Sequence, residues 1–104
     1  MTLRVLPEAR LETGQAAEWY EDERPGLGED FLQEVEAAYL KIEEHPRRHL
    51  RVSIAGLEER EFHRVTLRRF PYKVIYEIRE NDIVVVAVAH GHRKPNYWVE
   101  RTAD

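Results

Sequence analysis

The sequence contains no cysteine, so disulfide bonds and thiol chemistry are excluded. The first ten residues, MTLRVLPEAR, lack the apolar stretch of a signal peptide, and no later segment is apolar for long enough to cross a membrane. Phosphate-binding loops, dinucleotide fingerprints, internal repeats and low-complexity tracts are also missing. These absences predict a cytoplasmic protein that binds no membrane, and no cofactor is expected.

The chain has 104 residues, which is enough for a single domain, residues 1–104, with one modest core. Its formal net charge of -4 is unevenly distributed. Residues 1–61 contain 8 Lys and Arg against 15 Asp and Glu, whereas residues 62–104 contain 8 against 5. One interpretation is that the helix surfaces are simply acidic. The other is that the second half carries a positively charged working face.

Hydrophobic periodicity predicts a strand and two helices in the first half. Residues 3–6 read as a short strand, and residues 8–23 follow as a helix with a modest apolar stripe. A second helix comes after a break at residues 24–28, because apolar residues between 31 and 42 recur every three or four positions. Pro46 ends this helix. The helices are expected to form an antiparallel hairpin whose turn is shaped by its glycines.

Three strands are predicted in the second half, at residues 62–67, 72–78 and 83–89, after an irregular segment at residues 47–61. The last strand is apolar on both faces, so it is expected to be central in the sheet. Residues 96–101 are expected to form a short helix or an extension. The predicted fold is therefore α+β: a strand, a helix hairpin packed on one face of a small sheet, and three antiparallel strands.

The helix hairpin can cover only one face of this sheet. The opposite face is predicted to expose Arg64, Thr66, Arg68, Lys73 and Ile75 and to be open to a partner.

Four aromatic residues outside the predicted strands have structural interpretations. Trp19 and Tyr20 are interpreted as the core-facing side of the first helix, and Trp98 as a core residue under the last strand. Two interpretations of Tyr97 stay open: a core position and the stacking of nucleic-acid bases.

Several short motifs occur in a fixed order along nearly the whole chain. They are RPGLG at 24–28, Phe31 with Val35, Ile42 with Pro46, FPY at 70–72, Tyr76, and AVAHGHRKPNYW at 87–98. In this order and spacing they resemble the RelE/ParE superfamily, the toxin halves of type II toxin–antitoxin (plasmid stabilisation) systems. The histidine, arginine, proline and Tyr-Trp of the tail are more similar to the ParE branch. The resemblance implies the same strand–helix–helix–sheet fold and a cognate antitoxin as partner.

The resemblance implies two different activities. ParE-like members inhibit DNA gyrase, which is therefore the expected target. RelE-like members cut mRNA in the ribosome, a reaction that needs a base, a proton donor and cations for the charge of the phosphorane. A member of the same fold that has lost toxicity and acts as a binding module is a further alternative.

Two sets of site residues correspond to these activities. The residues expected to contact a bound target are Arg68, Arg69, His90, His92, Arg93 and Tyr97. The residues available to a ribonuclease are Arg64, Lys73, His92, Arg93 and Tyr97, with His92 or Tyr97 for proton transfer. Two departures from the RNA-cleaving pattern argue against cleavage. RNA-cleaving members resemble one another in having a lysine at the position of Thr66. They tend to have an arginine at the position of Lys73, and a lysine cannot replace its bidentate contact with a phosphate. The negative total charge is also unfavourable for an enzyme that works among ribosomal RNA.

The histidines near the last strand raise the question of a metal site. His90 and His92 share a face if the segment is extended, with His63 as a third candidate, but no carboxylate or cysteine completes the set. No metal is therefore expected. His90 is expected to end the central strand and to hydrogen-bond with the backbone there. Arg93 is interpreted as a functional residue rather than the partner of an acidic helix residue.

Overall fold

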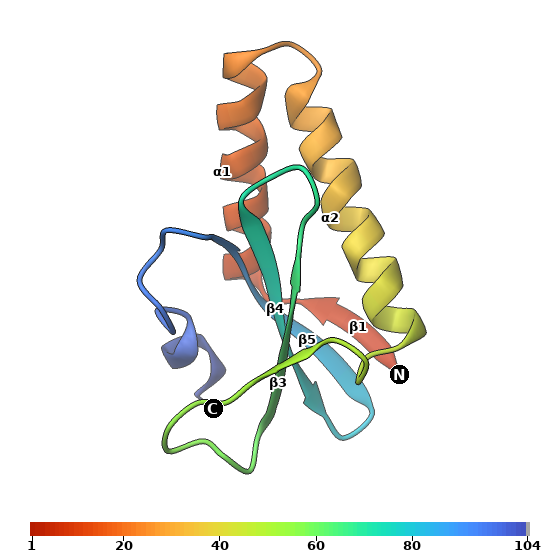
Figure 1. Cartoon of the computed structure of the whole chain (residues 1–104), viewed down its shortest axis with the longest axis vertical. Helices are drawn as coiled ribbons and strands as arrows, with labels where there is room; N and C mark the ends of the chain where they lie inside the picture. Colours follow the sequence, from red (N-terminus) through yellow and green to blue (C-terminus); the bar gives the residue numbers. More distant parts are fainter. Residues whose placement is uncertain (104) are drawn as a thin grey trace.

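The computed structural model describes residues 1–103 (Figure 1). The elements in chain order are β1 (Thr2–Val5), α1 (Pro7–Glu23), α2 (Leu27–Glu44), β2 (Leu50–Val52), β3 (Glu61–Thr66), β4 (Tyr72–Arg79), β5 (Asp82–His90) and a 3-10 helix (Val99–Thr102). The α1–α2 hairpin extends beyond one end of the sheet (Figure 1). The residues after β5, 91–103, are called the C-terminal segment and lie on the other side of the strands from α2. The predicted α+β fold is confirmed. Within residues 1–103, no helix combines the length and the apolar character needed to cross a membrane.

The turn between α1 and α2 depends on two glycines. Gly26 precedes α2 with a φ of 91°, a left-handed conformation that glycine adopts without strain. Gly28 lies at a close approach of the two helices, since a Cβ there would be 2.6 Å from the carbonyl oxygen of Ala17. The carboxylate of Glu21 accepts hydrogen bonds from the N–H groups of both glycines, at 3.0 and 3.1 Å. The predicted role of the glycines is confirmed, although α2 already begins at Leu27, inside the predicted break.

The strands form one sheet in the order β1-β5-β4-β3-β2. β1 runs parallel to β5, and the other neighbours are antiparallel. Residues 83–89 of β5 are all buried between β1 and β4, so the prediction of a central strand is confirmed. The prediction of an irregular segment at 47–61 is wrong for β2, which pairs with β3. β2 has three residues and an exposed Leu50, so it lacks the alternation that identifies a strand in a sequence.

The sheet has a core on each face. On the helix side, Phe31 and Ile42 of α2 pack with residues of the strands. On the opposite side, Trp98 packs on Phe62 with ring centroids 5.1 Å apart, as part of a second cluster. The prediction that this face is open is therefore wrong for Ile75, which is 3% exposed because segments outside the sheet pack over it.

The two tryptophans have opposite environments. Trp98 is 2% exposed, so its assignment to the core is confirmed, whereas Trp19 is 59% exposed and its assignment to the core is wrong. Its neighbour Tyr20 does face the core, with its ring centroid 4.8 Å from that of Phe70. Adjacent residues on a helix point in different directions, so only one aromatic of the pair can face inward.

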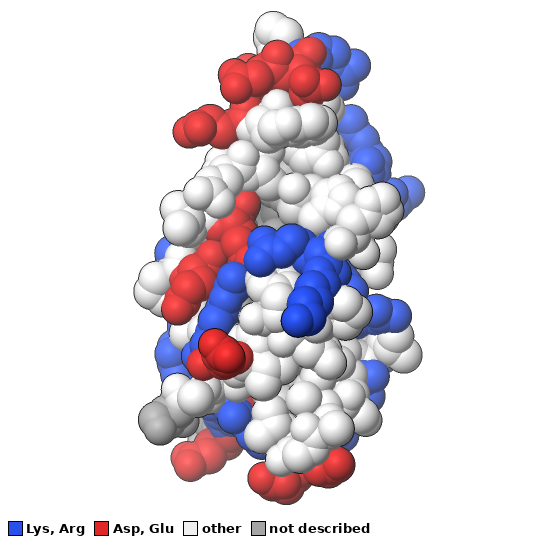
Figure 2. Space-filling model, turned by 90° about the vertical axis from the view of Figure 1, so that its left-hand side faces the viewer, with Lys and Arg blue, Asp and Glu red and all other residues white. Residues whose placement is uncertain are grey.

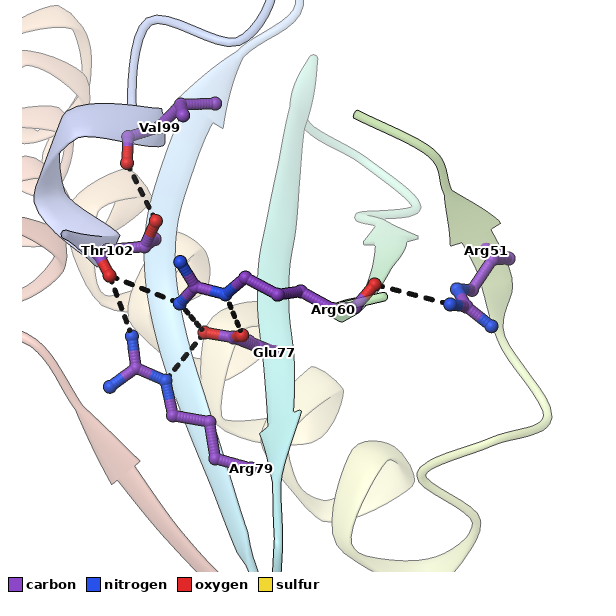
Figure 3. Close-up of polar contacts among 6 residues, drawn as sticks. All are labelled: Arg51, Arg60, Glu77, Arg79, Val99 and Thr102. Carbon is purple, nitrogen blue, oxygen red and sulfur yellow. Dashed lines mark hydrogen bonds and ion pairs between the residues drawn. The ribbon is translucent and has the colours of Figure 1, made fainter. Parts of the chain in front are cut away.

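A buried ion-pair network attaches the C-terminal segment to the sheet (Figure 3). Glu77 of β4 is 3% exposed, and Arg60 contacts both of its carboxylate oxygens, at 2.6 and 2.7 Å. Arg79 donates to the same carboxylate at 2.6 Å, and both arginines donate to the carbonyl oxygen of Thr102, at 3.1 and 3.2 Å. A buried carboxylate needs such partners to offset its loss of hydration. The network therefore fixes the 3-10 helix against β4.

Trp98→Ala is expected to lower the free energy of unfolding by about 3 kcal/mol, because it removes a fully packed side chain from the second core. Trp19→Ala is the matched control and is expected to change the free energy by less than about 0.5 kcal/mol, because Trp19 is exposed. Chemical denaturation followed by circular dichroism measures both values. Equal destabilisation by the two substitutions would contradict the burial difference.

Candidate functional site

A pocket of about 240 Å³ opens on the sheet face opposite the helices. Its basic lining residues are Arg64 of β3, Lys73 of β4, His90 at the end of β5, and Arg93 and Lys94 of the following segment. Its apolar lining residues are Val52, Ile75, Ala89, Pro95 and Trp98. Asn96 and Tyr97 complete it. We call this site the cationic pocket.

Strand register places two of the cations close together. Arg64 lies opposite Ile75, and Thr66 lies opposite Lys73, so Arg64 and Lys73 are diagonal neighbours on one face of the sheet. Diagonal neighbours have β carbons roughly 7–8 Å apart. Asn96, which also lines the pocket, adopts a left-handed φ of 63° that asparagine tolerates better than most residues.

No carboxylate contacts the Lys and Arg residues of the pocket, whereas half of the Lys and Arg residues elsewhere in the described chain have such a contact. Within residues 1–103, the side chains of Arg64, Lys73 and Lys94 have no hydrogen bond or ion pair, and no described carboxylate lines the pocket. Arginines elsewhere do contact a carboxylate; these are Arg4, Arg47, Arg60, Arg69, Arg79 and Arg101. Figure 2 shows the side that carries the C-terminal segment: basic side chains cross its middle, and acidic ones lie near the tip of the helix hairpin, beside the basic ones and at the opposite end of the molecule. The pocket is therefore a local concentration of positive charge on a protein whose net charge is negative.

Glu12 of α1 holds the wall of the pocket in place. Its carboxylate accepts a hydrogen bond from the hydroxyl of Tyr97 and two from the guanidinium of Arg101, the latter at 2.8 and 2.9 Å. It also accepts one from the N–H of Val88 at 3.0 Å, while Arg101 donates to the carbonyl of Val86 at 3.1 Å. A single carboxylate thus joins α1, β5 and the C-terminal segment.

Tyr97 is a positioned hydrogen-bond donor. Burial and the hydrogen bond to Glu12 both raise the pKa of Tyr97 above the ordinary value of 10.0. The phenol therefore keeps its proton at neutral pH, and that proton is directed to Glu12. The guanidinium of Arg93 lies over the Tyr97 ring, 3.8 Å from its centroid, so Tyr97 in turn positions Arg93.

The histidines do not form one cluster. His90 accepts a hydrogen bond from the N–H of His92 at 3.0 Å, so the expected backbone contact is present. His63 is buried elsewhere, with its ring nitrogens 2.8 Å from the carbonyl oxygen of His49 and the carboxylate of Glu61. Burial, which raises the pKa of Glu61, is outweighed by the hydrogen bonds from His63 and Arg47, which lower it. Within residues 1–103, no three His, Asp or Glu side chains are arranged to hold a metal ion.

The structure divides the expected target contacts into two groups. His90, Arg93 and Tyr97 line the cationic pocket together with Arg64 and Lys73, and His92 is exposed beside it.

Arg68 and Arg69 lie on the helix side instead. Arg69 is 3.3 Å from Asp30 of α2, and Glu34 accepts hydrogen bonds from both backbone N–H groups at 3.1 and 3.4 Å. The two arginines line a separate hollow next to α2. Lys94 is the pocket cation that sequence analysis did not select, although it lies inside the tail motif at 87–98.

Comparisons with known proteins identify the family. The family model described as "ParE toxin of type II toxin-antitoxin system, parDE" matches residues 3–95. A search of curated proteins finds no match. A solved structure entitled "Chromosomal ParDE TA system from P. aeruginosa" has the same fold, with a TM-score of 0.73 and 14% sequence identity over 86% of this chain and 95% of that one. Since the family model spans most of its length, the chain belongs to the ParE toxin family of type II toxin–antitoxin systems.

Proposed function

We propose that this toxin arrests growth by binding DNA gyrase and that a cognate antitoxin neutralises it. Membership of the ParE family supports a toxin that acts as half of a pair. The observation that favours binding over catalysis is the state of Tyr97, whose hydroxyl donates to Glu12 and whose pKa is raised. A phenol held in this way does not accept a proton from a substrate hydroxyl.

A RelE-like endoribonuclease acting on mRNA in the ribosome is the second candidate, because Arg64, Lys73 and Arg93 line one pocket. Proton transfer is the weak point of this alternative. His92 is exposed outside the pocket, and the Nδ1 atom of His90 already accepts a backbone hydrogen bond. The pocket therefore supplies charge for a phosphate but lacks a well-placed pair of acid and base.

The antitoxin is proposed to occupy the groove between the helices. Two hollows of about 340 and 550 Å³ along the α1–α2 hairpin share Gly14 and Leu32, so they form one groove. Its floor includes Ala17 and Val35, and a Cβ at Gly14 would meet nothing within 4 Å.

The rim of the groove carries four carboxylates and one cation, namely Glu18, Glu21, Glu29 and Glu36 with Arg10. An amphipathic segment with an apolar stripe and basic flanks complements such a groove. This is the segment that we propose for the antitoxin.

The gyrase proposal is tested with purified components. The toxin is expected to block supercoiling of relaxed plasmid by DNA gyrase and to leave ribosome-bound mRNA intact. Arg93→Ala is expected to weaken inhibition by about tenfold, as truncation of an interface arginine often does. Its effect on unfolding should stay near 1 kcal/mol or less, roughly the value of an exposed cation–π contact.

Arg48→Ala is the control, because Arg48 is exposed and lines neither the pocket nor the groove. It should inhibit gyrase as the unmodified toxin does. If gyrase supercoils the plasmid fully in the presence of the toxin and ribosome-bound mRNA is cut, the target is the ribosome and not gyrase. Normal growth after strong induction of folded protein would favour the non-toxic binding module.

The groove proposal is tested with Gly14→Leu. The added side chain fills the floor of the groove, so the affinity for the cognate antitoxin should fall about tenfold or more, a loss of hot-spot size. The fold should persist, because leucine favours a helix by up to about 1 kcal/mol over glycine. Isothermal titration calorimetry of the purified pair measures the affinity.

Asp22→Leu adds the same side chain to an exposed position of α1 outside the groove and should leave the affinity unchanged. Equal affinities for Gly14→Leu and Asp22→Leu would place the antitoxin elsewhere.

A further inference from the structure

We propose that His63 carries a proton on both ring nitrogens and clamps the connection between α2 and β2 to the sheet, and that β2 loosens when rising pH removes one of these protons. The proposal rests on hydrogen-bond geometry and does not depend on gyrase or an antitoxin as a partner.

The connection between α2 and β2, residues 45–49, is held by side chains of the sheet. The ring of His63 in β3 is buried, and its Nδ1 atom lies 2.8 Å from the carbonyl oxygen of His49. The hydroxyl of Tyr76 in β4 donates to the carbonyl oxygen of Pro46 at 2.6 Å. Two neighbouring strands therefore hold main-chain oxygens of the same connection.

Both ring nitrogens of His63 face oxygens that accept hydrogen bonds. Nδ1 faces the carbonyl of His49, and Nε2 lies 2.8 Å from a carboxylate oxygen of Glu61. This carboxylate is ionised, because it also accepts hydrogen bonds from Arg47 at 3.1 and 3.3 Å and because the pKa of Glu61 is lowered although burial alone would raise it. A carbonyl and an ionised carboxylate both need a donor, so each nitrogen of His63 carries a proton.

The aromatic neighbour of His63 suits a positive charge. The ring of Tyr76 is stacked on the imidazole, with the two centroids 5.4 Å apart and the planes 16° from parallel. Burial and the charge of Glu61 raise the pKa of Tyr76, so the phenol is neutral. An aromatic face within about 6 Å attracts a cation.

Two further groups that can carry charge face this cluster. Arg51 of β2 lies opposite His63, but its guanidinium donates to the carbonyl oxygen of Arg60 at 3.2 Å. The ring of His49 has its Nε2 atom 3.3 Å from the carbonyl oxygen of Lys41 in α2. Both side chains are thus directed to main-chain oxygens, whereas the carboxylate of Glu61 is in direct contact with the ring of His63.

Loss of one proton breaks one of the two contacts of His63. Hydrogen bonds to an ionised acceptor are about twice as strong as those between neutral groups, so the neutral ring keeps the proton that faces Glu61. The lone pair of Nδ1 then faces the carbonyl oxygen of His49, and that contact is lost. His49 directly precedes β2, which has only three residues paired with β3. Release of His49 therefore loosens β2.

Acid and base act on different halves of the clamp. Because the pKa of Glu61 is lowered from 4.5, the carboxylate is charged at and above that pH, and its contribution is lost as the pH falls through the lowered value. The second proton of His63 is lost in the opposite direction, as the pH rises. The clamp is complete only between these two titrations.

Loosening of β2 reaches the cationic pocket. Val52 of β2 lines the pocket, and Leu50 lies opposite Arg64, which also lines it. The side of the pocket formed by β2 therefore depends on the proton of His63.

The protonation state is tested by nuclear magnetic resonance on the full-length toxin with isotope-labelled histidine. Long-range proton–nitrogen correlation spectra are recorded while the pH is raised. Both ring nitrogens of His63 are expected to carry protons at neutral pH, and Nδ1 is expected to lose its proton first. A single protonated nitrogen of His63 at neutral pH would overturn the proposal.

Hydrogen exchange followed by mass spectrometry measures the loosening of β2. Protection of residues 49–52, corrected for the intrinsic pH dependence of exchange, should fall about tenfold across the His63 titration, the size of one lost buried hydrogen bond. Protection of β5 should stay constant across the same step. An equal loss in β5 would show general unfolding and would contradict a local clamp.

His63→Gln removes the titrating group, so its residues 49–52 should exchange without a pH step. His45→Gln is the matched control, because it removes an exposed histidine from the same connection, and it should keep the full step. A step that persists in His63→Gln would assign it to another group and overturn the proposal. If His63→Gln does not fold, the nitrogen spectra of the unmodified toxin decide alone.

Discussion

The central strand β5 has an edge that β1 covers only in part, and the completion of that edge organises the structure. The β1–β5 pairing ends at Val5 and Val85, whereas β5 continues to His90. Beyond that point the N–H of Val88 and the carbonyl of Val86 are satisfied by the side chains of Glu12 and Arg101. Unpaired backbone groups at a buried strand cost about 1–3 kcal/mol each, so an ion pair that acts as a short surrogate strand is strongly favoured.

This surrogate strand also places the candidate functional surface. Arg101 belongs to the C-terminal segment, so its contact with Glu12 brings that segment across the sheet, and the Glu77 network anchors the neighbouring residue, Thr102. Trp98 then covers the second face of the sheet, and Tyr97 fixes Arg93 at the rim. Residues of an irregular segment are thereby held on a rigid scaffold, a common arrangement for binding loops.

The sequence predicted the elements whose patterns are local. Periodicity identified α2 and the buried β5, and turn residues identified the hairpins that join β3 to β4 and β4 to β5. β2 could not be recognised, because pairing with β3 rather than an apolar pattern defines it.

The cover over the second face was also missed, because it depends on contacts between residues far apart in the chain, such as Glu12 with Arg101. The grouping of the site residues was missed for the same reason. Arg64, Lys73, Arg93 and Tyr97 were all selected, but their grouping around one pocket, away from Arg69, follows from the path of the tail.

The two proposed partners use surfaces of opposite charge that share no residue. The hairpin groove is rimmed mostly by carboxylates, and the cationic pocket is rimmed by arginine and lysine, so long-range fields favour partners of different charge at the two places. An antitoxin segment in the groove therefore does not need to imitate the target. Because the chain has a mass of only 12.4 kDa, any macromolecule seated on the pocket extends over neighbouring surface. In the proposed arrangement, neutralisation follows from the bulk of the antitoxin beside α1, and the sequence of its bound segment is free to match the groove alone.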